Sequence, residues 1–244
     1  MQRVCGRYAA AKDPAALAEE FGTPVPQESL AADYNVAPTK KVYVVMDRPE
    51  AGRSLEIARW GLIPSWAKDP SIGSRMINAR VETVDAKPAF RSAFAKRRCL
   101  VPATGYYEWY TPVDGPKGKA GKPLKQPFFI HPADGTSLAM AGLYEWWRDG
   151  SRDEDDPHAW RLTCTIITTD ATDEIGRIHD RMPMTVPKAA WEQWLEPQAR
   201  IDVHDILAPA ACLRLDAYPV STEVNSVRKN GPALITRQEG MAPG

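Results

Sequence analysis

The 244 residues are enough to bury one substantial hydrophobic core, so a single domain is expected. Hydrophobic residues make up 43% of the chain and charged residues 25%, which is typical of a globular protein, and no apolar run reaches the length of a membrane-spanning helix. The 31 basic and 31 acidic side chains cancel, so contact with a nucleic acid would need a local basic patch rather than overall charge.

The first predicted element is a helix at residues 13–22, DPAALAEEFG. Asp13 is a typical N-cap, Pro14 occupies the first helical position and Gly22 follows the last turn. Segments rich in β-branched and aromatic residues, separated by Pro, Gly and Asp, predict strands at 41–46, 55–60, 99–104, 127–131, 137–144 and 160–168. Further helices are expected at 89–97, 170–177, 187–196 and near 203–208.

Strands and helices do not alternate regularly along the chain. The pattern therefore predicts an α+β fold, with a strongly curved, mostly antiparallel β-sheet or barrel-like core and peripheral helices. Two segments are expected to be loops, a Gly- and Lys-rich one at 111–127 and an acidic one at 148–158. A five-residue echo, GYYEW at 105–109 and GLYEW at 142–146, is too short to indicate a repeat architecture.

Cys5 is unlike the other three cysteines, which sit in apolar segments as packing residues do: Cys99, Cys164 and Cys212. Cys5 lies among small and charged residues near the start of the chain, where a neighbouring cation and access to water favour the thiolate. Two interpretations stay open on this pattern alone. The residue is either a reactive nucleophile or a small side chain that opens the first strand.

The segment ATGYYEWY at 103–110 places a carboxylate among aromatic rings. Strand alternation puts Tyr106, Glu108 and Tyr110 on one face and Tyr107 and Trp109 on the other. Such surroundings favour the neutral carboxyl form, which suits a general acid or proton shuttle. A strand glutamate that faces solvent is the alternative, and the residues alone do not decide between the two.

Two further segments carry polar side chains that suit catalysis. His179, in IHDRMP, has the side-chain type that changes its charge nearest neutral pH, and Asn78 and Arg80 lie in MINARVET after an aromatic segment. Taken singly, a lone histidine is more often structural, and an asparagine before a small residue is usually a turn former.

Metal chemistry and disulfides are not expected. The four cysteines show no CxxC spacing and the four histidines no HExxH pattern, so we expect neither a disulfide framework, nor a metal site, nor a cofactor. The start of the chain lacks the basic and apolar segments of a secretory signal, which favours a reducing, cytoplasmic location.

Seven motifs in chain order resemble those of one family, SRAP (SOS response-associated peptidase): CGRY, YNVAPT, RWGLIPSWAKD, INARVET, GYYEW, IHDRMP and YPVSTEVN. The resemblance runs from Cys5 to about residue 235, and it implies an SRAP-type domain over 5–236 followed by a tail at 237–244. Members of this family protect abasic sites in single-stranded DNA. Their N-terminal cysteine becomes covalently joined to the DNA.

The resemblance also assigns roles to residues of this chain. It implies that Cys5 is the nucleophile, with three active-site partners: Asn78, Glu108 and His179. It further implies contacts to DNA, in which three arginines hold phosphates, a tryptophan contacts a base and a threonine supplies a polar strand-end contact: Arg7, Arg80, Arg181, Trp66 and Thr168. Where some members have two tryptophans, this chain has Trp66 followed by Ala67, so weaker base stacking is expected.

The implied activity is a covalent thiazolidine crosslink between Cys5 and an abasic site in single-stranded DNA, which shields the lesion during the DNA damage response. Lyase-like chemistry at the abasic site and self-cleavage are further activities to weigh. The expected partner is single-stranded DNA with an abasic site, not a membrane, and we expect a monomer that is associated with the nucleoid when bound.

Two rival functions stay open. The first is a thiol peptidase or autopeptidase that uses Cys5 and His179 with Glu108 or Asn78, although no oxyanion-hole motif is recognisable. The second is a single-strand binder without catalysis, which would use the arginines and Trp66 and would leave Cys5 and Glu108 unexplained.

Residues 1–4 conflict with the implied chemistry, because a thiazolidine needs a free α-amine on Cys5. Methionine aminopeptidase does not remove Met before a residue as bulky as Gln2, whereas it would remove a Met directly before Cys5. We therefore expect that translation begins at position 4, where a GTG start codon would have been read as Val4. Self-cleavage before Cys5 is the alternative.

Overall fold

The structure, a computed structural model, describes residues 6–48, 50–112, 116–117, 121, 123–153, 155–171, 173–203, 206 and 214–239, with the backbone alone at 173 and 174. Cys5, Cys212 and the leader at 1–4 lie outside these residues, as does most of the helix expected near 203–208. Within these ranges, no helix is long and apolar enough to cross a membrane.

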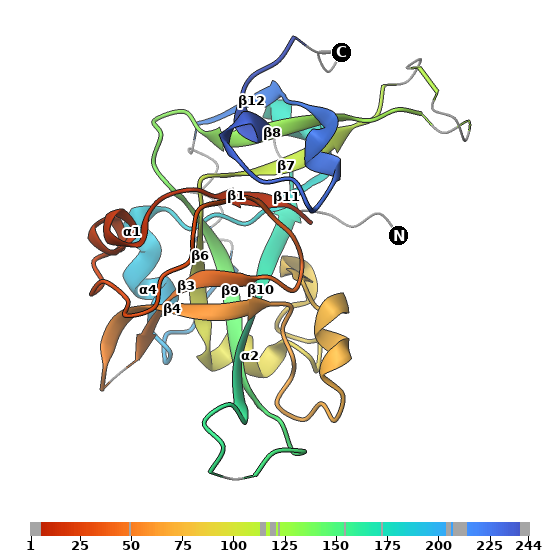
Figure 1. Ribbon diagram of the computed structural model, residues 1–244. Coiled ribbons are helices and arrows are strands. Elements are labelled where there is room, and N and C mark those ends of the chain that lie inside the picture. The colour runs from red at the N-terminus through yellow and green to blue at the C-terminus, as the bar shows by residue number, and fades with distance from the viewer. Residues whose placement is uncertain are drawn as a thin grey trace.

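A closed β-barrel forms the centre of the molecule (Figure 1). Its strands, in the order in which they pair, are β10 (Trp160–Asp170), β4 (Gly52–Trp60), β3 (Lys41–Arg48), β6 (Arg98–Ala103) and β9 (Leu138–Arg148). Pairing of β9 with β10 closes the ring. Only the β4–β10 pair is parallel, and the other four pairs are antiparallel. The barrel is therefore mixed but mostly antiparallel.

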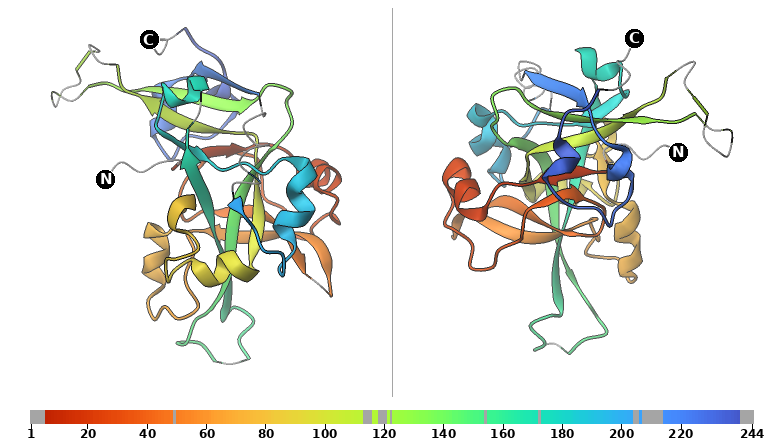
Figure 2. Two further views of the ribbon diagram at one scale, coloured as in Figure 1. Left: turned by 180° about the vertical axis from the view of Figure 1, so that it is seen from behind. Right: turned by 45° about the horizontal axis from the view of Figure 1, so that its top comes forward.

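The far half of β10 extends beyond β4 and pairs with two short strands, β5 (Asn78–Arg80) and β11 (Arg181–Pro183). A second, fully antiparallel sheet lies across this end of the barrel, as both panels of Figure 2 show. Its strands in spatial order are β12 (Leu215–Pro219), β8 (Gln126–Pro132), β7 (Gly105–Tyr110), β1 (Tyr8–Ala10) and β2 (Asp33–Val36). We call it the cap sheet.

The barrel interior and the inner face of the cap sheet share one apolar core. Inward residues of the barrel strands, such as Trp60, Val101 and Ile166, belong to the same buried cluster as Tyr8 and Tyr106 of the cap sheet. The rings of Tyr8 and Trp60 pack edge to face, with their centroids 5.2 Å apart. The cap sheet is therefore packed onto the mouth of the barrel.

The close packing of the interior needs a glycine in β9. A Cβ at Gly142 would lie 2.9 Å from Cys99 Sγ and 2.9 Å from Val101 Cγ2, so a side chain there would collide with β6. Gly142 is the first residue of GLYEW, the segment that resembles GYYEW at 105–109.

Three helices in the described part of the chain cover the outside of the barrel: α1 (Pro14–Phe21), α2 (Arg91–Lys96) and α4 (Trp191–Leu195). The short helix α3 (Asp173–Gly176) lies at the mouth of the barrel, where Ile175 joins the inner core. Turns of 3₁₀ helix occur at Pro70–Arg75, Val81–Thr83, Lys188–Ala190, Thr222–Asn225 and Pro232–Ile235. Apolar residues of α1, α2 and α4 form a second buried cluster with the outward residues of the strands. On the outer face of the cap sheet, Tyr107 and Phe129 form a third cluster with Val220, Val224 and Leu234 of the C-terminal segment.

The structure confirms the expected fold class and most of the expected helices and strands. The α1 helix is capped as predicted, because Asp13 accepts hydrogen bonds from the amides of Ala15 and Ala16, and Gly22 adopts the left-handed conformation at φ 66°. All six expected strands are present. The helices expected at 89–97, 170–177 and 187–196 are present but shorter, and the last begins as a 3₁₀ turn.

A buried arginine ties α2 and α4 to the barrel. Arg98, at the start of β6, is 3% exposed and donates hydrogen bonds to five backbone carbonyls: Phe94 O at 2.7 Å, Ala95 O at 3.2 Å, Trp194 O at 2.7 Å, Ala199 O at 3.2 Å and Glu196 O. These carbonyls lie at or just beyond the C-terminal ends of the two helices, where they have no partner within the helix and where a cation is favoured.

Arg98→Met should lower the free energy of unfolding by about 3 kcal/mol, because it leaves several buried carbonyls without donors. Urea unfolding followed by tryptophan fluorescence measures the effect. Arg91→Met is the matched control, since Arg91 is an exposed arginine of α2, and it should change the free energy by less than about 0.5 kcal/mol. Equal values for the two variants would contradict the role given to Arg98.

Candidate active site

Glu108 lies on β7 and faces the mouth of the barrel. Its neighbours on the same strand face, Tyr106 and Tyr110, both pack in or against the apolar core of the barrel, whereas Tyr107 and Trp109 belong to the outer cluster. Glu108 is 2% exposed, so the alternative of a strand glutamate in solvent is wrong. The Glu108 carboxyl group thus points into the contact between the mouth of the barrel and the inner face of the cap sheet, which we call the seam.

The opposite side of this seam is built by β5 and β10. In the parallel pairing, Asn78 is opposite Ile166 and Arg80 is opposite Thr168. Because paired residues share a sheet face, Asn78 and Thr168 lie on the inward face with Ile166, at the rim of the barrel. The turn suggested for Asn78 is therefore a short strand.

His179 comes just before β11, the strand that pairs with the end of β10. Ile175 and Ile178, which precede it, are buried in the barrel core and bring the histidine to the same rim. The backbone N–H of Arg181 donates to His179 Nδ1 at 3.0 Å, and Asp180 Oδ1 lies 2.9 Å from the same nitrogen. Since the backbone fixes the Arg181 amide as a donor to Nδ1 while the Asp180 side chain is 88% exposed, we assign Nδ1 as an acceptor and place a ring proton on Nε2.

The start of β1 leads into the seam. Tyr8 pairs with Tyr106, and the bonding continues one residue outward, because the amide of Tyr107 donates to Arg7 O at 3.0 Å. Counting this antiparallel register one step further places Gly6 beside Glu108. Cys5, the predicted nucleophile, is the next residue toward the N-terminus and lies outside the described residues.

Arg181 is buried in a charge cluster at the rim. Its guanidinium donates to Asp170 Oδ1 at 2.5 Å, to both carboxylate oxygens of Glu82 and to Thr168 O at 2.7 Å. Burial alone would lower the pKa of Arg181, but the hydrogen bonds and charges of Glu82 and Asp170 outweigh it and raise the pKa. The guanidinium in turn holds the pKa of Glu82 below its ordinary value, against the opposing effect of burial.

Arg80 and Trp66, two further predicted DNA contacts, are exposed. The described residues offer Arg80 no ion pair, so its charge faces solvent at the rim. Trp66 is 61% exposed in the loop after β4, and the adjacent Ala67 O accepts a bond from Trp147 Nε1 at 2.7 Å. Trp147 pairs with Arg161, which precedes Ile166 on β10 by five residues, and Ile166 pairs with Asn78. By the rise of a strand, Trp66 therefore lies about 16 Å along the barrel from Asn78.

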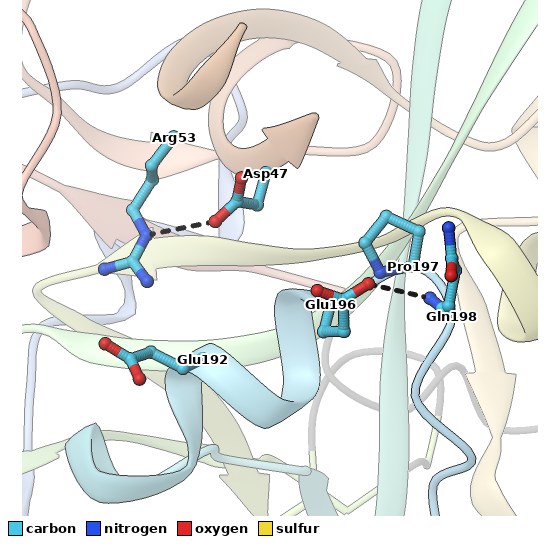
Figure 3. Close-up of a pocket in the computed structure, with 6 residues that line it drawn as sticks. All are labelled: Asp47, Arg53, Glu192, Glu196, Pro197 and Gln198. Carbon is cyan, nitrogen blue, oxygen red and sulfur yellow. Dashed lines mark hydrogen bonds and ion pairs between the residues drawn. The ribbon is translucent and has the colours of Figure 1, made fainter. Parts of the chain in front are cut away.

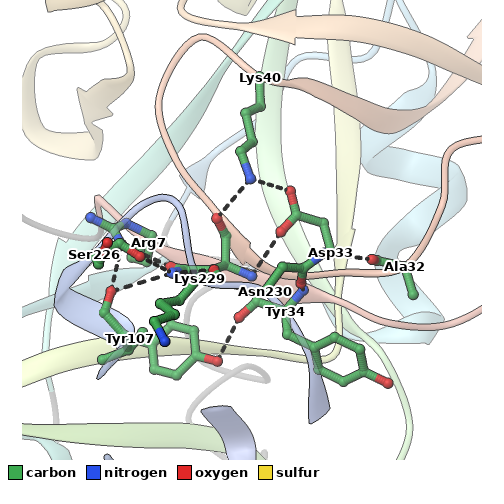
Figure 4. A network of polar contacts seen from close by, with 11 residues as sticks. Arg7, Ala32, Asp33, Tyr34, Lys40, Tyr107, Ser226, Lys229 and Asn230 are labelled. Carbon is green, nitrogen blue, oxygen red and sulfur yellow. Dashed lines mark hydrogen bonds and ion pairs between the residues drawn. The ribbon is translucent and has the colours of Figure 1, made fainter. Parts of the chain in front are cut away.

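Arg7 is held between β2 and the C-terminal segment (Figure 4). Its Nη1 donates to Asn35 Oδ1 at 2.7 Å and to Val224 O at 2.8 Å, and its guanidinium lies over the Trp109 ring at 6.0 Å. Burial lowers the pKa of Arg7, opposed by Tyr107 and Asp33. The arginine expected at a phosphate is thus also part of the fold.

The glutamate of the echoed segment has a different environment. Glu145, on β9, pairs with Arg97 Nη2 at 2.8 Å, and burial raises its pKa although Arg97 opposes this. It is opposite Thr163 in the β9–β10 pairing. The neighbouring pair, Tyr144 and Cys164, faces the barrel core, so Glu145 points to the outside of the barrel and away from the inward face that carries Asn78. The structure therefore favours Glu108, and not Glu145, as the glutamate of the site.

Two of the four cysteines are packing residues, as predicted. Cys99 and Cys164 are fully buried in the barrel, and burial raises the pKa of both thiols, which keeps them protonated and unreactive. Among the described residues, no group of three or more His, Cys, Asp or Glu side chains is placed to hold a metal ion.

A separate pocket of about 540 Å³ lies between the turn that joins β3 to β4 and the end of α4 (Figure 3). It is lined by Asp47, Arg53, Glu192, Glu196, Pro197 and Gln198. None of the predicted site residues reaches it, so we place the candidate active site at the seam and not in this pocket.

Sequence reasoning missed three residues that support the seam. Glu82 and Asp170 neutralise Arg181, and Asn35 holds Arg7. The signal for Asn35 was its place in the YNVAPT motif, but its partners are 28 and about 190 residues away, at distances that no local pattern reports.

Comparison with known proteins identifies the family of this chain. The family model described as SOS response associated peptidase (SRAP) matches residues 4–227. The abasic site processing protein YoqW of Bacillus subtilis is 36% identical over 236 residues, covering 95% of this chain and 99% of the relative, and YedK of Escherichia coli is 30% identical over 241 residues, covering 95% and 99%. HMCES of Gallus gallus, also named an abasic site processing protein, is 33% identical over 219 residues, covering 79% of this chain and 60% of the relative.

Solved structures share the fold. A crystal structure of a protein from Bacteroides thetaiotaomicron superposes with a TM-score of 0.76 at 26% identity, covering 96% of this chain and 100% of that one. A family model that spans nearly the whole chain, relatives above 30% identity over most of their length and a common fold lead to one conclusion: this chain belongs to the SRAP family.

Proposed function

We propose that this protein recognises abasic sites in single-stranded DNA and joins its Cys5 to them as a thiazolidine, which shields the lesion. One observation carries the proposal above all. Asn78, Glu108 and His179 come from three separate segments and lie on the two sides of one seam, where the strand that follows Cys5 begins. The names of the relatives, abasic site processing proteins, support the substrate.

The chemistry needs only the α-amine and the thiol of an N-terminal cysteine. The amine adds to the C1′ aldehyde of the ring-opened sugar, and loss of water gives an imine. The sulfur then adds to the same carbon while its proton passes to the nitrogen, which closes a five-membered ring. Because both nucleophiles are tethered to one residue, the second addition costs little further entropy.

The seam residues would move and hold protons for these steps. Glu108, buried beside the N-terminal strand, would shuttle protons between the amine, the leaving water and the sugar. His179 would donate from Nε2 to a sugar oxygen during ring opening, while the amide of Arg181 holds its Nδ1. Asn78, fixed on β5, would orient the N-terminal residue by hydrogen bonding.

DNA would bind along the rim. Arg80 offers an exposed cation to a phosphate at the rim, and Trp66, farther along the barrel, offers an exposed ring to a base of the same strand. Thr168 and Arg181 lie deeper, so for Arg181 a phosphate contact would compete with Glu82 and Asp170, whose side chains are 45% and 83% exposed.

The thiol peptidase remains the second candidate. The family description and a buried acid near a histidine favour it, but a peptidase also needs oxyanion donors aimed at a carbonyl. Both functions use the seam, and the crosslinking assays below separate them, because a peptidase forms no DNA adduct.

Cys5→Ser, produced so that residue 5 is the first residue, should form only a short-lived adduct, since an oxazolidine hydrolyses far more readily than a thiazolidine. Cys5→Ala should bind the same DNA and form no ring. Incubation with an oligonucleotide containing one abasic site, then heating and denaturing electrophoresis, measures the surviving adduct. A heat-stable adduct from Cys5→Ser would rule out the thiazolidine.

Glu108→Gln should slow adduct formation by about 100-fold, because it removes the proton shuttle while keeping the shape of the side chain. Glu145→Gln is the matched control from the echoed segment and should change the rate less than about 2-fold, since Glu145 pairs with Arg97 outside the seam. Rates are measured with saturating DNA. A larger loss in the control would move the function to Glu145.

Arg80→Ala should flatten the salt dependence of single-strand binding by about 0.7 in the slope of log K against log salt concentration, the value of one phosphate contact. Arg152→Ala, which removes an arginine paired with Asp149 and Asp156 in the acidic loop, should leave the slope unchanged. Binding is measured by fluorescence anisotropy with an undamaged oligonucleotide, so the crosslink does not interfere. Equal slopes for Arg80→Ala and wild type would place the DNA elsewhere.

A further inference from the structure

Asn35 is a buried asparagine with every side-chain polar atom in use. It lies on β2, is 0% exposed, and its Oδ1 accepts from Arg7 Nη1 at 2.7 Å. Its Nδ2 donates to Ser226 O and Lys229 O, both at 2.9 Å, with a longer contact to Val224 O at 3.4 Å. A reversed amide would set its oxygen against three carbonyls and its nitrogen against a cation, so the orientation is determined.

These bonds connect both ends of the chain through one side chain. Arg7 belongs to the segment that leads into the seam, and Val224, Ser226 and Lys229 belong to the C-terminal segment. Arg7 Nη1 also bonds Val224 O directly at 2.8 Å, and Trp109 Nε1 donates to Asn225 Oδ1 at 2.7 Å beneath the Arg7 guanidinium. Arg7 is thereby fixed from three sides.

Further contacts hold the strand on which Asn35 lies. Lys40 Nζ donates to Asn35 O at 3.0 Å and pairs with Asp33 at 2.5 Å, and Tyr107 Oη donates to Tyr34 O at 2.7 Å (Figure 4). Asn35 is thus a rigid support on β2. The register of β1 and β7 places Gly6, the residue between Arg7 and Cys5, beside Glu108. A shift of Arg7 would therefore carry the N-terminal cysteine away from the Glu108 carboxyl group.

We propose that Asn35 is a positioning residue for the crosslinking reaction: by gripping Arg7 against the C-terminal segment, it sets where the N-terminal cysteine meets the abasic sugar. This inference rests on the proposed function and names a further residue that the reaction needs. Asparagine suits the position because it supplies one acceptor and two donors. Aspartate would face three carbonyls, and leucine would leave the Arg7 guanidinium and the carbonyls without partners.

The test compares adduct formation by Asn35→Ala with that of a matched control, Asn230→Ala. Asn230 is exposed and also joins the C-terminal segment to β2, through Tyr34 N at 2.8 Å and Ala32 O at 3.2 Å, but it does not contact Arg7. At saturating DNA, Asn35→Ala should react at least about 10-fold more slowly because a small misplacement of reacting groups is costly, and Asn230→Ala less than about 2-fold. Thermal unfolding of both variants reports any general loss of stability.

A double-mutant cycle separates positioning from stability. In an Arg7→Met background, Asn35→Ala should cause no further loss of rate beyond about 2-fold, because it acts through Arg7. If Asn35→Ala does not fold, Arg7→Lys provides the test instead. It keeps the cation, and so the salt dependence of DNA binding, but loses the planar fork, and its rate at saturating DNA should fall by a similar factor.

The outcomes distinguish the two proposals. All proteins in this test begin at Cys5, and if wild-type protein of that form gives no adduct, the proposed function is wrong and this inference falls with it. If wild type crosslinks and folded Asn35→Ala or Arg7→Lys crosslinks equally fast, or if the losses in the cycle add, the inference alone is overturned.

Discussion

Strand β10 hydrogen-bonds to four other strands, and the site residues on the β5 and β11 side of the seam depend on that one stretch of main chain for their placement. Its first half closes the barrel between β9 and β4, and its second half holds β5 and β11 at the rim. Because side chains alternate along a strand, a slip of one residue in the β5 register would turn Asn78 from the seam to the outside.

The charges at the seam explain how a protein of zero net charge can meet a polyanion. Arg181 is neutralised by Glu82 and Asp170, and Arg7 is engaged by uncharged groups, so the cations nearest the catalytic residues mainly maintain geometry. Positive charge available to solvent comes from exposed side chains such as Arg80. Under the proposed function, catalytic geometry and DNA affinity would therefore depend largely on different arginines.

Local patterns predicted the elements, and distant pairings decided their arrangement. The caps of α1, the six main strands and the two faces of residues 106–110 follow from nearest neighbours in the sequence, and all are present. The parallel β4–β10 pair, the closing β9–β10 pair and the three-residue strands β5 and β11 depend on contacts between remote segments, for which a single sequence holds no periodic signal. The motifs identified which residues belong together, whereas the seam that unites them and the buried roles of Asn35 and Arg181 emerged only from the fold.

The bond between Arg7 and Val224 spans 217 positions of the chain, and this has a consequence for synthesis on the ribosome. Arg7 emerges well before the carbonyls that fix it and Asn35, because Val224 follows Arg7 by 217 positions. A nascent chain therefore carries its N-terminal residues through most of elongation without the support that orients them. Under the proposed function, the N-terminal residue would therefore be oriented only once the C-terminal segment has folded back over the cap sheet, and chains without that segment would be poor reagents for aldehydes.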